Sequence, residues 1–248
     1  MQTQTIERQR TNRAAGPPSV VAFAGAAAFV IAATWFWLAS KGVTVAAVPQ
    51  IGRDVAPQQG MRIYYHWQAT TLTQERYYTS LAIAGFLCLA AATAYVRDLL
   101  GSDHPPARIG SLLVGAGALL WITGSILQLG GHRAVGLMAT HANPIQATNS
   151  IAFTIDAISQ AFALAAFALT GVGMLALAAA AQRQRHRGWS AYTVGTALMM
   201  LVTAGAYAAG NDNFLDLMLI ADGGVLLPVW LIWASHIGGT GQPSPHTP

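Results

Sequence analysis

Six stretches of this chain are apolar over roughly the 20 residues that an α-helix needs to cross the hydrocarbon core of a bilayer. The clearest is the first, because residues 14–40 include no charged side chain. Hydrophobic residues make up 54% of the chain and charged residues only 9%, whereas about a quarter of the residues in a soluble domain are charged. The sequence therefore predicts an all-α fold, a polytopic transmembrane helical bundle.

The apolar stretches form one predicted transmembrane domain, residues 19–236. Prolines and basic clusters mark the ends of several helices, because proline stops one helix and favours the start of the next. The six spans are expected at about residues 19–38, 77–96, 109–130, 151–181, 189–209 and 214–235. Flanking tails, residues 1–18 and 237–248, are rich in Gln, Thr, Pro, Gly and Ser and are expected to be disordered and cytoplasmic.

Segment 41–76 is too polar to span a membrane and is expected to form an outer loop. Pro49, Gly52, Pro57 and Gly60 interrupt its first part. Its second part, about residues 61–78, is dense in Tyr and Trp, which concentrate at the level of the lipid headgroups. We interpret this part as an interfacial helix or as the aromatic collar of span two.

Basic residues indicate the orientation, because cytoplasmic loops of membrane proteins carry an excess of Lys and Arg. With the amino terminus inside, eight of the 13 basic residues face the cytoplasm: Arg8, Arg10, Arg13, Arg97, Arg108, Arg183, Arg185 and Arg187. The other side then carries Lys41, Arg53, Arg62, Arg76 and Arg133. Both termini are therefore predicted to be cytoplasmic. The scattered basic residues are read as topology signals, so no nucleic-acid partner is expected.

Small residues predict how closely the spans pack. Between helices in lipid, backbones approach each other where Gly and Ala replace larger side chains. Span three is narrow over a full turn at residues 115–118, Gly-Ala-Gly-Ala. We expect tight packing there, with no function attached to it.

Asp222 is the first candidate for a functional residue, because a charged group inside a membrane span is costly and calls for a role. It lies about 12 Å into span six, counting from Phe214 at 1.5 Å per residue. Gly223, Gly224 and Pro228 follow it, and Pro228 removes a hydrogen bond from the helix. We predict a hinge here, resembling the broken helices of transporters. The alternative is that Asp222 only hydrogen-bonds a neighbour near the outer face.

Asp156 is the second candidate, near the outer end of span four. Asn149, Asp156 and Gln160 are spaced seven and four residues apart, so on a helix they form one polar stripe. This stripe either lines a proton or substrate site or fixes the packing of neighbouring helices. If Asp156 and Asp222 share one outward-opening vestibule, at least one of them would bind a proton.

Three histidines suggest a different class of function. His66, His132 and His141 are all expected on the outer face, with Glu75, Asp212 and Asp216 nearby. Together they could hold zinc or copper, although compact ligand spacings such as HxxxH are missing. Solvated or structural histidines are the alternative interpretation.

Enzyme motifs are absent from the sequence. Ser111, Ser125 and Ser159 lie outside any GxSxG context, and neither a Walker loop nor a dinucleotide fingerprint occurs. We therefore assign no catalytic residue and expect no cofactor, and the chain is more consistent with a non-enzyme. Cys88 is the single cysteine and lies within an apolar run, as a small buried residue would.

The layout resembles uncharacterised bacterial six-span integral membrane proteins of the domain-of-unknown-function kind. The features that carry this resemblance are the outer segment after the first span, the polar start of span four and the closing run Leu226-Leu227-Pro228-Val229-Trp230. It implies a bacterial plasma membrane and no particular activity.

From the residues we expect small-solute or proton-linked transport through the bundle. The alternatives are a non-catalytic membrane sensor or assembly partner that binds lipid or protein through residues 64–78, and an outer-face metal-dependent enzyme. Membrane lipid, a small solute or proton, and a protein partner or second copy are the partners considered.

Overall fold

The computed structural model describes residues 19–44, 55–140, 145–183, 186–210 and 212–237. Its elements are α2 (Ser19–Ser40), α3 (Pro57–Leu99), α4 (Pro105–Thr140), α5 (Ile145–Arg183), α6 (Arg187–Ala209), α7 (Asp212–Ala221), the π-helix η2 (Asp222–Leu226) and α8 (Leu227–His236). These elements are all helical, and α7, η2 and α8 form one continuous rod. The predicted all-helical architecture is confirmed.

Six of these helices are long and apolar enough to cross a membrane. They are Ser19–Ser40, Gln58–Leu99, Pro105–Ala139, Ile145–Arg183, Arg187–Ala209 and Phe214–His236. The number agrees with the six predicted spans, and each predicted span falls on one helix. The predicted tails, 1–18 and most of 237–248, lie outside the described residues, whereas Ile237 is described and packs in the core.

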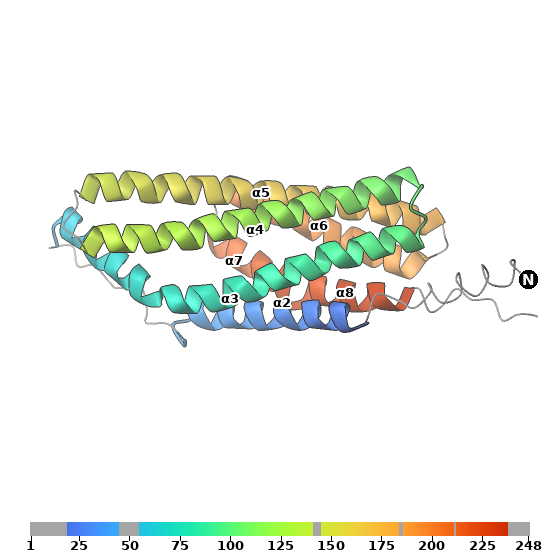
Figure 1. Ribbon diagram of the computed structural model, residues 1–248, viewed down its shortest axis with the longest axis horizontal. Coiled ribbons are helices and arrows are strands. Elements are labelled where there is room, and N and C mark those ends of the chain that lie inside the picture. Colours follow the sequence, from blue (N-terminus) through green and yellow to red (C-terminus); the bar gives the residue numbers. More distant parts are fainter. Residues whose placement is uncertain (1–18, 45–54, 141–144, 184–185, 211, 238–248) are drawn as a thin grey trace, which may run out of the picture.

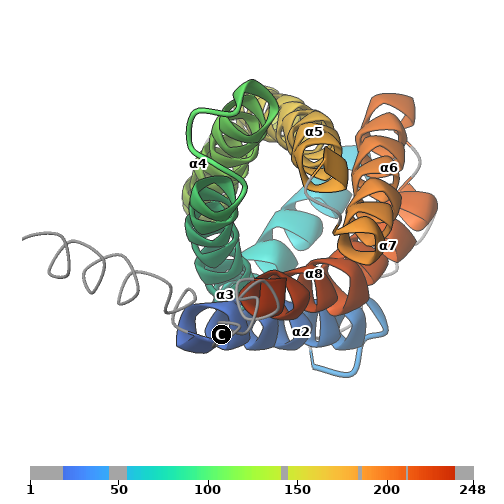
Figure 2. The ribbon, with the colours of Figure 1, turned by 90° about the vertical axis from the view of Figure 1, so that its right-hand side faces the viewer.

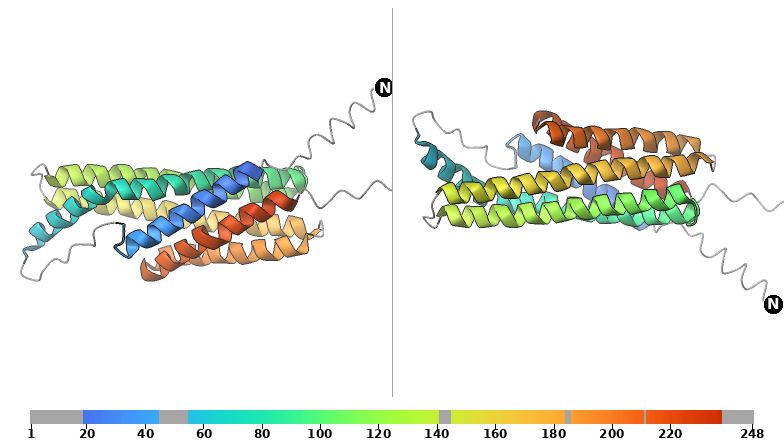
Figure 3. Two further views of the ribbon diagram at one scale, coloured as in Figure 1. Left: turned by 90° about the horizontal axis from the view of Figure 1, so that it is seen from below. Right: turned by 90° about the horizontal axis from the view of Figure 1, so that it is seen from above.

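The helices form a closed ring in which each one packs against its neighbours in the chain (Figure 2). The ring closes because α2 lies against both α3 and the α7–α8 rod, a crossing visible in Figure 3. We call the end with Ser19, Leu99, Arg183 and Ile237 the base, and the opposite end, with Pro57 and Ile145, the top (Figure 1).

At the top, α3, α4 and α5 extend beyond the other helices (Figure 1). This corrects the predicted outer loop 41–76 in part, because residues 57–76 are the first turns of α3. The aromatic part, residues 61–78, is helical and continuous with span two, in agreement with the helix interpreted there. Pro57 stands at the first helical positions, where its missing N–H costs nothing, so it starts the helix and does not break it. Residues 45–54 lie outside the described part of the chain.

A small apolar cluster holds this extension together. Tyr65, Val135, Ala139 and Ile145 are buried against one another between α3, α4 and α5. Arg62 donates from Nη1 to the carbonyl of Ala139 at 3.1 Å, which satisfies one of the free carbonyls at the end of α4. The extension is therefore a packed part of the bundle.

Glycines spaced seven residues apart bring α4 and α5 together. A Cβ built on Gly110 would lie 2.7 Å from the carbonyl oxygen of Gly173, and one on Gly131 would lie 2.5 Å from Ile155. Gly117 and Gly124 face α5 in the same way, whereas Gly115 has open space around it. A seven-residue period keeps one helix face against its partner. The tight packing expected of span three thus involves Gly117 but not Gly115.

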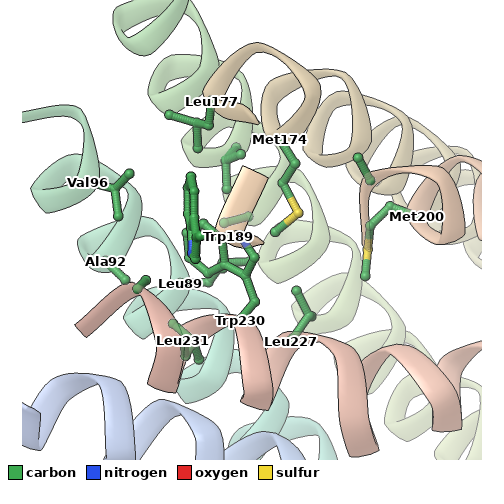
Figure 4. Packing of buried hydrophobic residues seen from close by; sticks show 14 of the residues in the cluster. Leu89, Ala92, Val96, Met174, Leu177, Trp189, Met200, Leu227, Trp230 and Leu231 are labelled. Atoms are coloured by element: carbon green, nitrogen blue, oxygen red, sulfur yellow. The ribbon is translucent and has the colours of Figure 1, made fainter. Parts of the chain in front are cut away.

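The base half of the ring is filled by a hydrophobic core (Figure 4). Trp230 is fully buried, its ring centroid lies 5.5 Å from that of Trp189, and its indole N–H donates to Thr193 at 3.0 Å. Surrounding it are Leu89, Val96, Met174, Leu177, Met200, Leu227 and Leu231. The open space of the bundle therefore lies toward the top.

Candidate functional site

A cavity of about 310 Å³ lies between this core and the top of the bundle. All six spans contribute to its wall. Its polar lining residues are Glu75, Tyr78, Thr79, Ser125, Gln128, Asp156, Ser159, Gln160, Tyr207, Asp216 and Asp222. We call it the central cavity. Its volume falls in the range of ligand sites, about 300 to 1,000 Å³.

Asp222 lies where the last span changes from α-helix to π-helix. The N–H of Leu227 bonds to the carbonyl of Asp222, five residues back, in place of the usual four. Pro228 has no N–H to donate, and the hydroxyl of Tyr192 donates to the carbonyl of Leu226 at 3.1 Å. The altered turn thus contains the predicted hinge residues Gly223 and Gly224, and Pro228 follows it at the start of α8.

The two glycines bring this turn close to α2. A Cβ built on Gly223 or Gly224 would lie 3.5 or 3.7 Å from the Cβ of Ala33, which is ordinary contact. Small side chains on both helices therefore let the backbone of η2 lie beside α2. The carboxylate of Asp222 borders the cavity and lies close to the middle of the span Phe214–His236.

One oxygen of Asp222 is partnered and the other is not. The side chain is only 2% exposed, Oδ2 lies 2.6 Å from the hydroxyl of Thr203, and Oδ1 has no hydrogen-bond partner among the described residues. A buried carboxylate oxygen without a partner costs free energy. A proton or a cationic ligand would remove that cost.

The hydroxyl of Thr203 also lies 3.0 Å from the carbonyl oxygen of Met199. It has one proton and can serve only one of these two acceptors. When Asp222 is ionised, Thr203 donates to it and leaves the Met199 carbonyl. When Asp222 is protonated, its O–H donates to Thr203, which donates to the carbonyl of Met199, while Oδ1 still has no partner among the described residues. The site thus has a hydrogen-bonding arrangement for either protonation state.

His132 bridges two carboxylates nearer the top. Its Nδ1 lies 3.0 Å from Glu75 on α3, and its Nε2 lies 3.3 Å from Asp156 on α5. The side chains of His132 and Glu75 are 11% and 15% exposed, whereas Asp156 is 48% exposed. Both contacts are hydrogen bonds only if the ring carries two protons or one carboxyl is protonated. If both hydrogen bonds form, this His132 cluster (His132, Glu75 and Asp156) shares one proton among its three groups.

Asp156 borders a second cavity, of about 510 Å³, above the His132 cluster. His132, Tyr64, Tyr65 and Asn149 also line it, and the hydroxyl of Tyr65 donates to Asn149 at 2.6 Å. We call it the upper cavity. Asp156 is thus shared by the two cavities, and His132 stands at their boundary.

The structure brings together most of the residues that the sequence singled out. Asp156, Gln160 and Asp222 line the central cavity, and Asn149 lines the upper one. The two aspartates therefore border the same cavity. Thr203 and Gln128 were missed, because nothing in a single sequence distinguishes a cavity-facing hydroxyl or amide from one that packs between helices.

The predicted metal site is not formed by the described residues. Within the described ranges, no group of three His, Cys, Asp or Glu side chains is placed to hold one ion. His66 is exposed on α3, and His132 has its two nitrogens turned to different carboxylates. His141 lies outside the described residues.

Comparisons with known proteins returned no relative of this chain. No protein-family model, curated protein or solved structure matches it.

Proposed function

We propose that the chain is a bacterial plasma-membrane protein that carries a small solute through the helical bundle, linked to the movement of protons. One observation supports this proposal most strongly. Asp222 is buried near the middle of its span. It borders the central cavity, which extends toward the top and is also lined by Asp156. An ionisable group at this depth is a functional site by default.

Protons have a series of sites along the bundle. The upper cavity leads to the His132 cluster, and Asp156 connects this cluster to the central cavity and Asp222. The His132 cluster makes both of its hydrogen bonds only with an added proton, whereas Asp222 keeps its hydrogen bond to Thr203 with or without one. Water in the cavities would complete the connection between successive groups.

The packed side chains at the base close the proposed pathway at that end. Trp230, Leu227 and Met174 fill the ring below Asp222, so a solute that enters from the top stops at the central cavity (Figure 4). Release at the base requires these side chains to separate. The last span changes its hydrogen bonding at the π-helical turn of η2. Alternating access in transporters takes place around such broken helices, so η2 is the element at which we expect the span to bend.

The orientation follows from the distribution of basic residues. We propose that the base and both termini are cytoplasmic and that the top faces outward. A purely structural sensor or assembly partner would instead be expected to have a filled bundle, and the central cavity favours transport over this alternative.

The test is infrared difference spectroscopy of the purified protein in lipid during a pH titration. We expect a carboxylic acid band that appears on protonation and is absent from Asp222→Asn. In liposomes, the same substitution should abolish proton movement driven by an imposed pH gradient. If the variant retains every titrating band and the full proton flux, Asp222 is structural and the proposal is wrong.

A further inference from the structure

The charged residues of the central cavity have one sign. Among the described residues that line it, the charged side chains are Glu75, Asp156, Asp216 and Asp222, all of them acids. His132 lies behind this wall and is already bonded to Glu75 and Asp156. The field inside the cavity therefore favours a cation and opposes an anion.

Aromatic rings from opposite sides of the bundle make up much of the remaining wall. Phe86 on α3 stacks on Trp121 on α4 with centroids 4.5 Å apart, and Phe167 on α5 stacks on Tyr207 on α6 at 5.8 Å. Rings of this kind offer apolar surface and, through their faces, an attraction for organic cations. A hydrated metal ion would gain little from such a wall.

Two buried polar groups at the wall have no hydrogen-bond partner among the residues that the structure describes. Asp222 Oδ1 is one of them, and the hydroxyl of Ser159, which is only 7% exposed, is the other. Both residues line the cavity. Buried polar atoms normally have a hydrogen-bond partner, so these two atoms indicate that the cavity binds a ligand that supplies one.

We propose that the central cavity binds a small organic cation with an apolar ring or alkyl body, its ammonium group paired with Asp222. This inference rests on the proposed transport function and names its substrate class. The cation and the proton compete for one carboxylate: when the cation binds, the Asp222 O–H bond breaks, the proton passes to water, and the carboxylate left behind pairs with the cation. Exchange of one proton for one monovalent cation leaves the charge of the site unchanged.

The test uses the full chain in lipid nanodiscs with benzyltrimethylammonium as the probe. This probe has a fixed charge and no ionisable proton, so any proton released on binding comes from the protein. Calorimetry at one pH in two buffers of different ionisation enthalpy gives the affinity and the number of protons released. Benzyl alcohol and benzoate serve as neutral and anionic compounds with the same ring.

We expect the probe to bind with release of up to one proton, and benzoate to show no binding. Asp222→Asn should weaken probe binding by at least about tenfold, and Asp222→Glu, which keeps the charge, should restore most of it. Asp98→Asn is the matched control, because Asp98 is exposed at the base, is paired with Arg97 and does not line the cavity. Circular dichroism and gel filtration establish that each variant is folded.

The outcomes separate this inference from the function on which it rests. If the Asp222 band titrates and protons move, but benzyl alcohol binds as well as the cation or the cation does not bind, the substrate class is wrong and proton linkage stands. If the cation binds equally to the wild type and to Asp222→Asn, the assigned site is wrong. If the Asp222 band is missing altogether, the proposed function fails.

Discussion

Thr203 on α6 holds Asp222 on η2 through a hydroxyl that lies 2.6 Å from the carboxylate, with both residues buried. This contact links two spans at the depth of the central cavity. It is also the point at which a change in protonation at Asp222 is passed to the backbone, because the same hydroxyl reaches the carbonyl of Met199.

Thr203→Val should remove this link without changing the shape of the side chain. We expect a loss of about 1 to 3 kcal/mol in the free energy of unfolding, because a buried carboxylate loses its hydrogen-bonding partner. The infrared band of Asp222 should also shift. Thermal unfolding in detergent measures the first effect.

Thr123→Val is the matched control for this variant. Thr123 is exposed, and its hydroxyl donates to the Leu119 carbonyl of its own helix. Equal losses of stability in the two variants would show that Thr203 contributes nothing through Asp222.

His132→Ala should destabilise the protein by about 1 to 3 kcal/mol, because Glu75 and Asp156 each lose a hydrogen bond. Adding Glu75→Gln to this variant should recover part of the loss, since one of the two facing charges is then gone. A double-mutant cycle on the melting transition measures the coupling. Strictly additive effects would contradict the bridging role, and His66→Ala, at an exposed position on α3, should change little.

Gly110→Ala should destabilise the α4–α5 pair. The added Cβ would lie 2.7 Å from the backbone oxygen of Gly173, and backbone cannot yield as a flexible side chain does. Overpacking of this kind costs about 1 to 3 kcal/mol. Gly115→Ala, five residues along the same helix in open space, should be neutral or slightly stabilising, so similar melting temperatures for the two variants would refute the packing argument.

Gly223→Ala should separate stability from transport. The new methyl group would lie at ordinary contact distance from Ala33, and alanine favours helix over glycine by up to about 1 kcal/mol. We expect unchanged or higher thermal stability together with slower proton flux, because the turn of η2 becomes stiffer. Gly205 has open space around it, so Gly205→Ala should raise stability without slowing proton flux. Equal flux in both variants would exclude a hinge at Gly223.

Cysteine labelling tests the orientation in whole cells. In a Cys88→Ala background, Gln146→Cys lies exposed at the top and Ser102→Cys exposed at the base. A maleimide that cannot cross membranes should label the first from outside and the second only after lysis. The reverse pattern would place both termini outside.

The six spans could be predicted from the sequence because a helix in lipid needs a long apolar run, and such a run is visible without knowing what it packs against. The ends of the helices could not be predicted in this way. The breaks predicted at Pro57 and Gly60 are not present, because proline is favoured at the start of a helix and glycine is tolerated inside one. Polar composition excluded a membrane span there, but it did not exclude helix.

The candidate site was predictable only in part. Asp222 was found because an acid inside an apolar run is conspicuous, and Gly223, Gly224 and Pro228 marked the altered turn beside it. The pairing of Glu75 with His132 depends on how α3 and α4 are rotated against each other, which no local pattern encodes. The seven-residue glycine period of α4 was a readable signal for its contact with α5.

That glycine period has a mechanical consequence. Helices α4 and α5 are 36 and 39 residues long, and the glycines of α4 lie against the backbone of α5 at Gly110 and Gly117 and against the side chain of Ile155 at Gly131. They can neither slide past each other nor separate without losing contacts along about 50 Å of length. The pair therefore behaves as a single stiff beam running the full height of the protein. Any motion that closes the top and opens the base must be a motion of the other four helices against this beam.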